Sequence, residues 1–156
     1  MKYYGEIMHQ VFTIKRYSRE LIQKHFDKIF VFGDNLDRYG LGGQAKAARG
    51  ESNSLGIVTK IDPSLCYVEE DFKYYVNQTE NDFRLLDVYY EMGKTIVLPK
   101  DGIGTGLADL HNTAPSIMEY IDKRFNFLAS RALNKEVTNW SEELPDFSTS
   151  EEPPLF

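Results

Sequence analysis

The chain has 156 residues, 42% of them hydrophobic, and a formal net charge of −6, which suits one domain with a sizeable hydrophobic core. No apolar run approaches the ~20 residues of a membrane span, and the first residues do not resemble a signal peptide, so we expect a cytoplasmic protein that binds no membrane. One cysteine and three histidines are too few for a disulfide or a structural zinc site, so we expect no metal and no other cofactor.

The negative charge is concentrated at the C-terminal end. Six acidic residues and no basic residue follow Lys135, and without these six the chain has 18 acidic and 18 basic side chains. We therefore predict a folded domain over residues 1–135 and an acidic, partly disordered tail over residues 136–156. A neutral body argues against non-specific binding to nucleic acid, which depends on clustered Lys and Arg.

Residues 1–17 contain alternating apolar and polar positions, which fit a short strand or an irregular lead-in. Ser18 is a good N-cap for a two-turn helix that ends near residue 26. The apolar run that follows predicts a strand over residues 28–32, and an alanine-rich stretch predicts a helix that begins at residue 44.

The second half of the chain continues the alternation. Residues 56–59 predict a strand, and residues 79–82 resemble a capping box that opens a helix over about 80–92, with Gly93 as its stop. A strand over 95–99 and a helix beginning near Pro115 complete the pattern. Strands that alternate with helices predict an α/β fold with a mostly parallel sheet, whose ligands lie beyond the carboxyl ends of the strands.

Two glycine-rich turns, at residues 39–45 and 101–107, each follow one of the predicted strands. Glycine lets the backbone approach a ligand closely, and unpaired main-chain N–H groups attract anions. Two such turns at one edge of a sheet indicate a ligand with adjacent phosphates. The alternative is that both turns are only tight connections.

Two common nucleotide-binding motifs do not explain these turns. Gly40, Gly42 and Ala45 satisfy a G-x-G-x-x-A pattern, but residues 33–39 separate it from its strand, which disfavours a nicotinamide Rossmann fold. The chain also lacks a G-x-x-x-x-G-K-[ST] loop, so a P-loop phosphotransferase has no support.

Four segments come in the order of a macrodomain: GDN at 33–35, RYGLGGQA at 38–45, IVTK at 57–60 and PKDGIGTGL at 99–107. Over residues 28–125 the chain resembles the macrodomain superfamily, and within it the branch of terminal ADP-ribose glycohydrolases, DNA ADP-ribosylation antitoxins and small macro-like proteins of bacteriophages. The resemblance implies a three-layer α/β/α fold and a partner that is ADP-ribose, free or attached to DNA or protein.

The same resemblance implies roles for individual residues. Asn35 would face the distal ribose, although a turn residue after a strand is an equally good reading, and Asp34 would contact the ligand or cap a turn. The two glycine turns and the end of the middle strand would supply the remaining contacts, from Gly42, Gly43, Gln44, Thr59, Gly102, Ile103, Gly104, Thr105, Gly106 and Leu107.

Lys60 is expected to be a nucleophile or an electrostatic anchor, since a lysine at this place in the similar glycohydrolases attacks the anomeric carbon of the distal ribose. The alternative is a solvent-exposed charge at the end of a strand. The related enzymes place Asp directly after the second glycine turn, where this chain has Ala108 and then Asp109. Three alternatives follow. Asp109 is re-aimed toward the site, Asp101 substitutes for it, or the protein binds ADP-ribose without hydrolysing it.

The sequence leaves the function open among four classes. The leading hypothesis is an ADP-ribosyl glycohydrolase. The others are a non-catalytic binder of free ADP-ribose or a related nucleotide signal, a phosphatase of ADP-ribose 1″-phosphate, and an interaction protein whose acidic tail contacts a basic partner.

Overall fold

The structure is a computed structural model that describes residues 10–133, so the domain end predicted at 135 and the acidic tail predicted over 136–156 lie outside the described residues. Its five-stranded sheet has the order β1-β5-β2-β3-β4. All neighbours are parallel except the pair β3 and β4. The strands are β1 (Val11–Ile14), β2 (Lys28–Asn35), β3 (Ser54–Asp62), β4 (Leu65–Cys66) and β5 (Thr95–Pro99).

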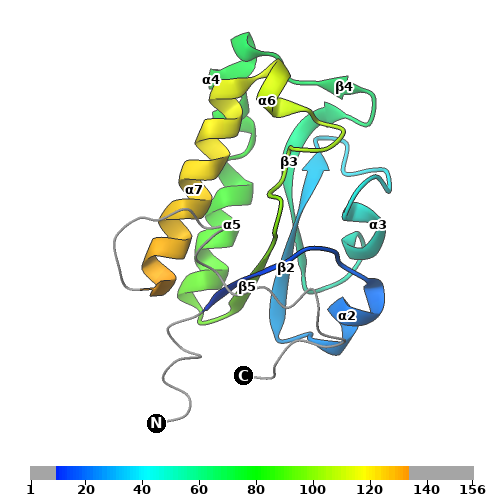
Figure 1. The fold of residues 1–156 in the computed structure, drawn as a ribbon, viewed down its shortest axis with the longest axis vertical. Coiled ribbons are helices and arrows are strands. Elements are labelled where there is room, and N and C mark those ends of the chain that lie inside the picture. Colours follow the sequence, from blue (N-terminus) through cyan, green and yellow to red (C-terminus); the bar gives the residue numbers. More distant parts are fainter. Residues whose placement is uncertain (1–9, 134–156) are drawn as a thin grey trace.

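Helices cover both faces of this sheet (Figure 1). The short helices α2 (Arg19–Lys24) and α3 (Ala45–Ala48) lie on one face, and α5 (Glu80–Glu91) and α7 (Pro115–Leu133) lie on the other. Three further short helices complete the described chain: the 3-10 helix η1 (Glu69–Asp71), α4 (Phe72–Gln78) and α6 (Leu110–Thr113). The predicted α/β class with a mostly parallel sheet is confirmed.

The predicted strands are present, and two of them are longer than expected. β2 continues through Asn35 and β3 continues through Asp62. The residues expected to follow these strands are therefore the last residues of the strands themselves. Residues 11–14 form an edge strand, which settles the choice between a strand and an irregular lead-in. The sequence signalled neither the two-residue strand β4 nor helix α4.

Two predicted helix ends are confirmed. Ser18 caps α2, because its Oγ accepts a hydrogen bond from the Leu21 N–H at 3.0 Å. After α5, Gly93 takes a positive φ of 86°, and the Lys94 N–H then donates to the Tyr89 carbonyl at 3.0 Å. A glycine at this position avoids the steric penalty of a left-handed backbone.

The capping box predicted at residues 79–82 is wrong. The Thr79 side chain caps no N–H group and instead donates to the Tyr75 carbonyl at 2.8 Å, because α4 runs almost directly into α5. Asp82 is buried against the sheet and accepts a hydrogen bond from the Val58 N–H at 3.0 Å. Asp82, which the sequence predicted to be part of a capping box, thus joins α5 to β3.

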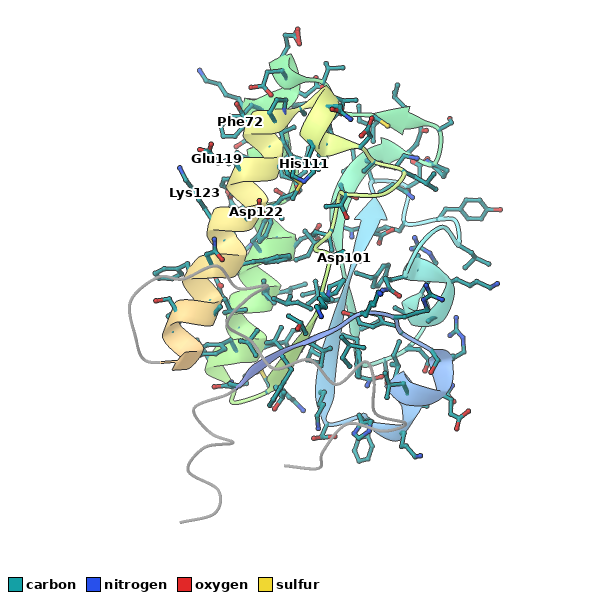
Figure 2. All side chains as sticks on the ribbon, in the orientation of Figure 1. Phe72, Asp101, His111, Glu119, Asp122 and Lys123 are labelled. Carbon is teal, nitrogen blue, oxygen red and sulfur yellow. The ribbon has the colours of Figure 1, made fainter. Side chains whose placement is uncertain are left out.

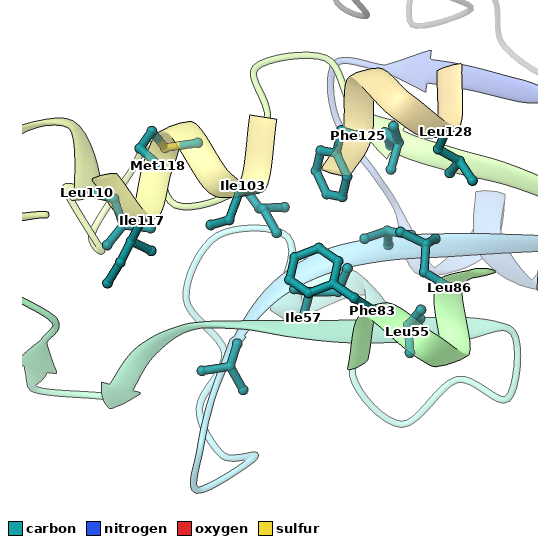
Figure 3. Close-up of a cluster of buried hydrophobic side chains, with 14 of the residues drawn as sticks. Leu55, Ile57, Phe83, Leu86, Ile103, Leu110, Ile117, Met118, Phe125 and Leu128 are labelled. Carbon is teal, nitrogen blue, oxygen red and sulfur yellow. The ribbon is translucent and has the colours of Figure 1, made fainter. Parts of the chain in front are cut away.

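The larger hydrophobic core lies between the sheet and helices α5 and α7 (Figure 3). It includes Ile103, from the second glycine turn, and Leu110, from α6, which are 3% and 0% exposed. The loop that follows β5 is therefore held in the core by side chains on both of its halves. Within residues 10–133, every helix is too short or too polar to cross a bilayer.

Candidate functional site

A cleft of about 880 Å³ lies at the carboxyl edge of the parallel strands. Its walls come from the loops after β1, β2 and β5, and from the end of β3. Both glycine turns line it. Two segments about sixty residues apart in the chain thus face one ligand-sized space, as expected for loops at the carboxyl ends of parallel strands.

Most main-chain N–H groups of the two turns are unpaired, the exceptions being those of Ala45 and Gly102, which donate to the Gly42 and Pro99 carbonyls. Within the described residues, none of these groups donates a hydrogen bond from the three residues 42–44 or from the six residues 103–108. Gly43, Gly102 and Gly104 have φ values of 58°, 81° and 80°. Backbone of this kind gathers successive N–H groups into a concave anion-binding nest, so both walls offer donors to an anion.

The two turns meet across the cleft. A Cβ built on Gly42 would stand 3.2 Å from Leu107 Cδ1, so the first turn touches the side chain that ends the second. Beneath them, Thr59 Oγ1 lies 3.2 Å from a Cβ built on Gly33, and its Cγ2 lies 3.6 Å from one built on Gly104. Thr59 therefore forms the floor between the walls.

Asn35 carries an unpaired acceptor at the end of β2. Its side chain is buried, and its Nδ2 donates to the Tyr39 carbonyl at 2.6 Å. Its Oδ1 is a buried atom without a hydrogen-bond partner in the described structure. Because buried polar atoms are normally paired, this oxygen is suited to accept a hydrogen bond from a hydroxyl group of a ligand. Asn35 is one of the cleft-lining residues.

Lys60 lies beside Asn35, because the two residues are partners in the β2–β3 ladder after a register shift at Asp34. Its side chain is half-buried and lines the cleft. The Nζ atom donates to the Pro63 carbonyl at 2.6 Å. The amine must leave that carbonyl before it can attack a ligand.

The structure brings only one of the two candidate acids to the cleft. Asp101 is exposed and lines the cleft, on the sheet side of the molecule and apart from Asp122 on α7 (Figure 2). Asp109 does not line it. Asp109 is the N-cap residue of α6 and has a φ of 50°. Its Oδ1 accepts a hydrogen bond from Asn112 Nδ2 at 2.8 Å, and Ala108 lines the cleft in its place. The one-residue shift has turned the second carboxylate away.

Asp34 lines the cleft, and both oxygens of its carboxylate accept hydrogen bonds from the protein. It accepts hydrogen bonds from Arg49 at 2.5 Å, from Arg38 at 3.2 Å and from the Asn35 N–H at 2.8 Å. Arg49 also donates through Nε to the Gly40 carbonyl at 2.7 Å. Both oxygens of Asp34 thus pair with an arginine, and through Arg49 the carboxylate fixes the first glycine turn.

The network continues through Arg38 to α5. Arg38 donates to Asp82 at 2.7 Å and to the Gly56 carbonyl at 2.9 Å. Burial disfavours its charge, but hydrogen bonds and charge from Asp82, then from Asp34, outweigh this and raise the pKa of Arg38. Sequence reasoning missed these residues, because nothing in the chain indicates that positions 38 and 82 meet.

Gln44 uses its main chain and its side chain differently. Its N–H is one of the unpaired cleft donors. Its side-chain Oε1 accepts from the Tyr17 N–H at 3.0 Å, and its Nε2 donates to the Lys15 carbonyl at 3.1 Å. The side chain therefore ties the loop after β1 to the first glycine turn.

The cleft lining is rich in positive charge. It has two acidic residues, Asp34 and Asp101, against six basic ones, which are Lys15, Arg16, Arg19, Lys46, Arg49 and Lys60. Lys15 and Arg16 directly follow the strand at 11–14, and this basic pair was a sequence signal for a positively charged cleft wall that the sequence analysis missed. Among residues 10–133 no cluster of His, Cys, Asp and Glu is arranged to hold a metal ion.

Residues 12–124 match DUF7831, a family of unknown function, and the chain belongs to that family. The matched span contains every residue that lines the cleft. The comparisons with curated proteins and with solved structures gave no match.

Proposed function

We propose that this DUF7831 protein is a macrodomain-like protein that binds ADP-ribose and hydrolyses an ADP-ribosyl linkage on a macromolecule. One observation carries the proposal: two glycine turns offer unpaired main-chain N–H groups to a single cleft, beside a buried and unpaired Asn35 Oδ1. Donors on two walls fit a diphosphate, and an orphan acceptor next to them fits a sugar hydroxyl.

The electrostatics of the cleft support an anionic ligand. The chain as a whole is negative, yet six of the eight charged residues in the cleft lining are basic. Asp34 is neutralised by two arginines, so Asp101 is the one acidic side chain there without a bonded partner in the described chain. Two phosphates in this cleft would meet amide donors and a positive surround.

The order of the strands supports one orientation of the proposed ligand. Asn35 ends β2, and Lys60 lies next to it on β3, on the far side of the second glycine turn from β1. With the diphosphate between the turns, a ribose placed at Asn35 has its anomeric carbon toward Lys60. The adenosine half then extends toward β1.

Hydrolysis at that carbon needs a nucleophile and a proton acceptor. In the proposed first step Lys60 Nζ, in its neutral form, forms a bond to the anomeric carbon, and the bond to the macromolecule breaks with its electron pair on the leaving atom. Water then replaces Lys60 at that carbon. The leaving atom has taken up the proton that the amine released in the first step, and the Asp101 carboxylate passes the proton lost by the water to the departing Lys60 amine, which leaves as the neutral amine.

A non-catalytic binder is the second candidate. Two observations favour it: Ala108 occupies the position expected for the acid, and Lys60 Nζ is engaged by the Pro63 carbonyl. Neither affects the diphosphate site, so binding of free ADP-ribose survives if catalysis fails.

Calorimetric titration with ADP-ribose tests the shared part of both candidates, and the absence of binding at millimolar ligand would reject both. Release of ADP-ribose from ADP-ribosylated DNA and from ADP-ribosylated protein then separates hydrolase from binder. Lys60→Ala should abolish release while leaving ADP-ribose affinity within a few-fold. The matched control is Lys73→Ala on α4, which removes an exposed lysine outside the cleft.

A further inference from the structure

We propose that the β1 end of the cleft holds a second anion subsite, which binds a phosphate on the adenosine half of the ligand. The inference rests on the proposed binding of ADP-ribose and names a narrower ligand class: ADP-ribose that carries an additional phosphate on its adenosine ribose. The inference is drawn from three basic side chains that pair with no acidic residue in the described chain, those of Lys15, Arg16 and Lys46.

These three side chains are exposed and line the cleft. None of them makes an ion pair or a side-chain hydrogen bond with any part of the chain from residue 10 to residue 133. The neighbouring arginines differ, since Arg19 pairs with Glu51 at 2.5 Å and Arg49 pairs with Asp34 at 2.5 Å. The protein thus keeps positive charge available at one end of the cleft.

The backbone that carries these cations is held in place. Tyr17 is buried, and its hydroxyl donates to the Val31 carbonyl at 2.7 Å and lies 3.1 Å from the Val97 carbonyl. Gln44 bonds the backbone on both sides of Arg16, as described above. Arg19 donates to the Lys46 carbonyl at 2.9 Å, which joins α2 to α3. The backbone from which these side chains extend therefore loses little entropy when an anion binds.

The sheet order separates this subsite from the reactive end. β1 is two strands away from β2 and three from β3, which at ~4.8 Å per strand amounts to about 10 and 14 Å. The second glycine turn, after β5, lies between them. A ligand with its distal ribose at Asn35 and its diphosphate between the turns brings its adenosine half to Lys15 and Arg16.

One phosphate group fits this patch better than a polynucleotide. A phosphate monoester carries about two negative charges at neutral pH, which three cations can balance. A nucleic-acid strand requires a longer basic surface, whereas residues 1–135 have equal numbers of acidic and basic side chains.

The experiment compares two probes by calorimetry: ADP-ribose and ADP-ribose 2′-phosphate. Because charge-assisted hydrogen bonds to phosphate are strong, we expect the wild type to bind the 2′-phosphate form roughly tenfold more tightly. The double variant Lys15→Ala/Arg16→Ala should bind the two probes with equal affinity, because it loses more affinity for the 2′-phosphate form than for ADP-ribose. Lys73→Ala should keep the preference.

Four outcomes would overturn the inference. Equal wild-type affinity for the two probes rejects the subsite and leaves the proposed function intact. If the double variant weakens both probes equally, the cations serve the shared diphosphate. If a short single-stranded oligonucleotide competes with the probe, and the double variant abolishes that competition, the patch binds polynucleotide. If neither probe binds, the proposed function fails and the inference fails with it.

Discussion

A Cβ built on Gly56 would stand 2.9 Å from the Cβ of Asp34, because the Asp34 side chain lies directly over this glycine of β3. The contact leaves room for no side chain at position 56. It also explains how a carboxylate buried in the sheet receives two arginines, since Arg38 reaches both Asp34 and the Gly56 carbonyl. The first glycine turn depends on this arrangement through Arg49.

We predict that Gly56→Ala lowers the free energy of unfolding by about 1–3 kcal/mol, because the added methyl displaces Asp34 and its arginines. Chemical denaturation measures the loss. Gly106→Ala is the control, since a Cβ at that position meets no atom within 4 Å. Equal stability of the two variants would contradict the close packing of Asp34 over Gly56.

Arg49→Lys should loosen the first glycine turn. Lysine keeps the charge near Asp34 but loses the planar fork that also reaches the Gly40 carbonyl, at a cost of about 1–3 kcal/mol for the lost charged hydrogen bond. We expect weaker ADP-ribose binding and faster amide hydrogen exchange over residues 45–48, whose N–H groups donate to the carbonyls of residues 42–44. Arg84→Lys, on the exposed face of α5, should change neither measurement. Unchanged exchange in Arg49→Lys would argue against a role of Arg49 in fixing the first glycine turn.

The two candidate acids can be separated by a matched pair of variants. If the protein is a hydrolase, Asp101→Asn should slow ADP-ribose release by about 100-fold, the usual contribution of a positioned acid or base. Asp109→Asn should leave turnover within a few-fold, because this side chain bonds Asn112 outside the cleft. The reverse pattern would restore Asp109 to the site and reject Asp101.

Glu69 should contribute a pH-dependent part of the stability. Its carboxylate accepts hydrogen bonds from the Ser116 hydroxyl and, at 3.0 Å, from the Ser116 N–H at the start of α7, and these bonds lower the pKa of Glu69. The folded state therefore favours the ionised form. The contribution is fully present above the unfolded pKa of about 4.3 and is lost as the pH falls through the lower, folded pKa.

Glu69→Gln tests this linkage. The variant should melt below the wild type at pH 7, and the two melting temperatures should converge toward pH 3. A difference that stays constant over this range would show that the carboxylate charge is not what stabilises the start of α7.

Much of the arrangement was predictable because it depends on local signals. The glycine turns follow apolar runs, and alternation of strands with helices places strand ends at one edge, which sufficed to bring residues 42–44 and 103–107 to one cleft. Ser18 and Gly93 act through hydrogen bonds with residues at most a few positions away. Their roles followed from residue type and spacing alone.

What could not be predicted depends on contacts between distant segments. Thr79 and Asp82 have the spacing of a capping box, yet burial against β3 and the approach of Arg38 give Asp82 a different role. The direction of the Asp109 side chain depends on one backbone angle, a φ of 50°, which sequence spacing does not determine. Asp34 likewise pairs with Arg49, which lies 15 positions further along the chain.

The burial of Ile103 and Leu110 gives the two walls of the cleft unequal freedom to move. Displacement of the second glycine turn would pull both side chains out of the interior between β3 and α7, whereas Tyr39 and Leu41 of the first turn stand 72% and 63% exposed to solvent. The Tyr39 and Leu41 side chains can therefore rearrange over the mouth of the cleft, while hydrogen bonds to the Tyr39 and Gly40 carbonyls hold the backbone beneath them.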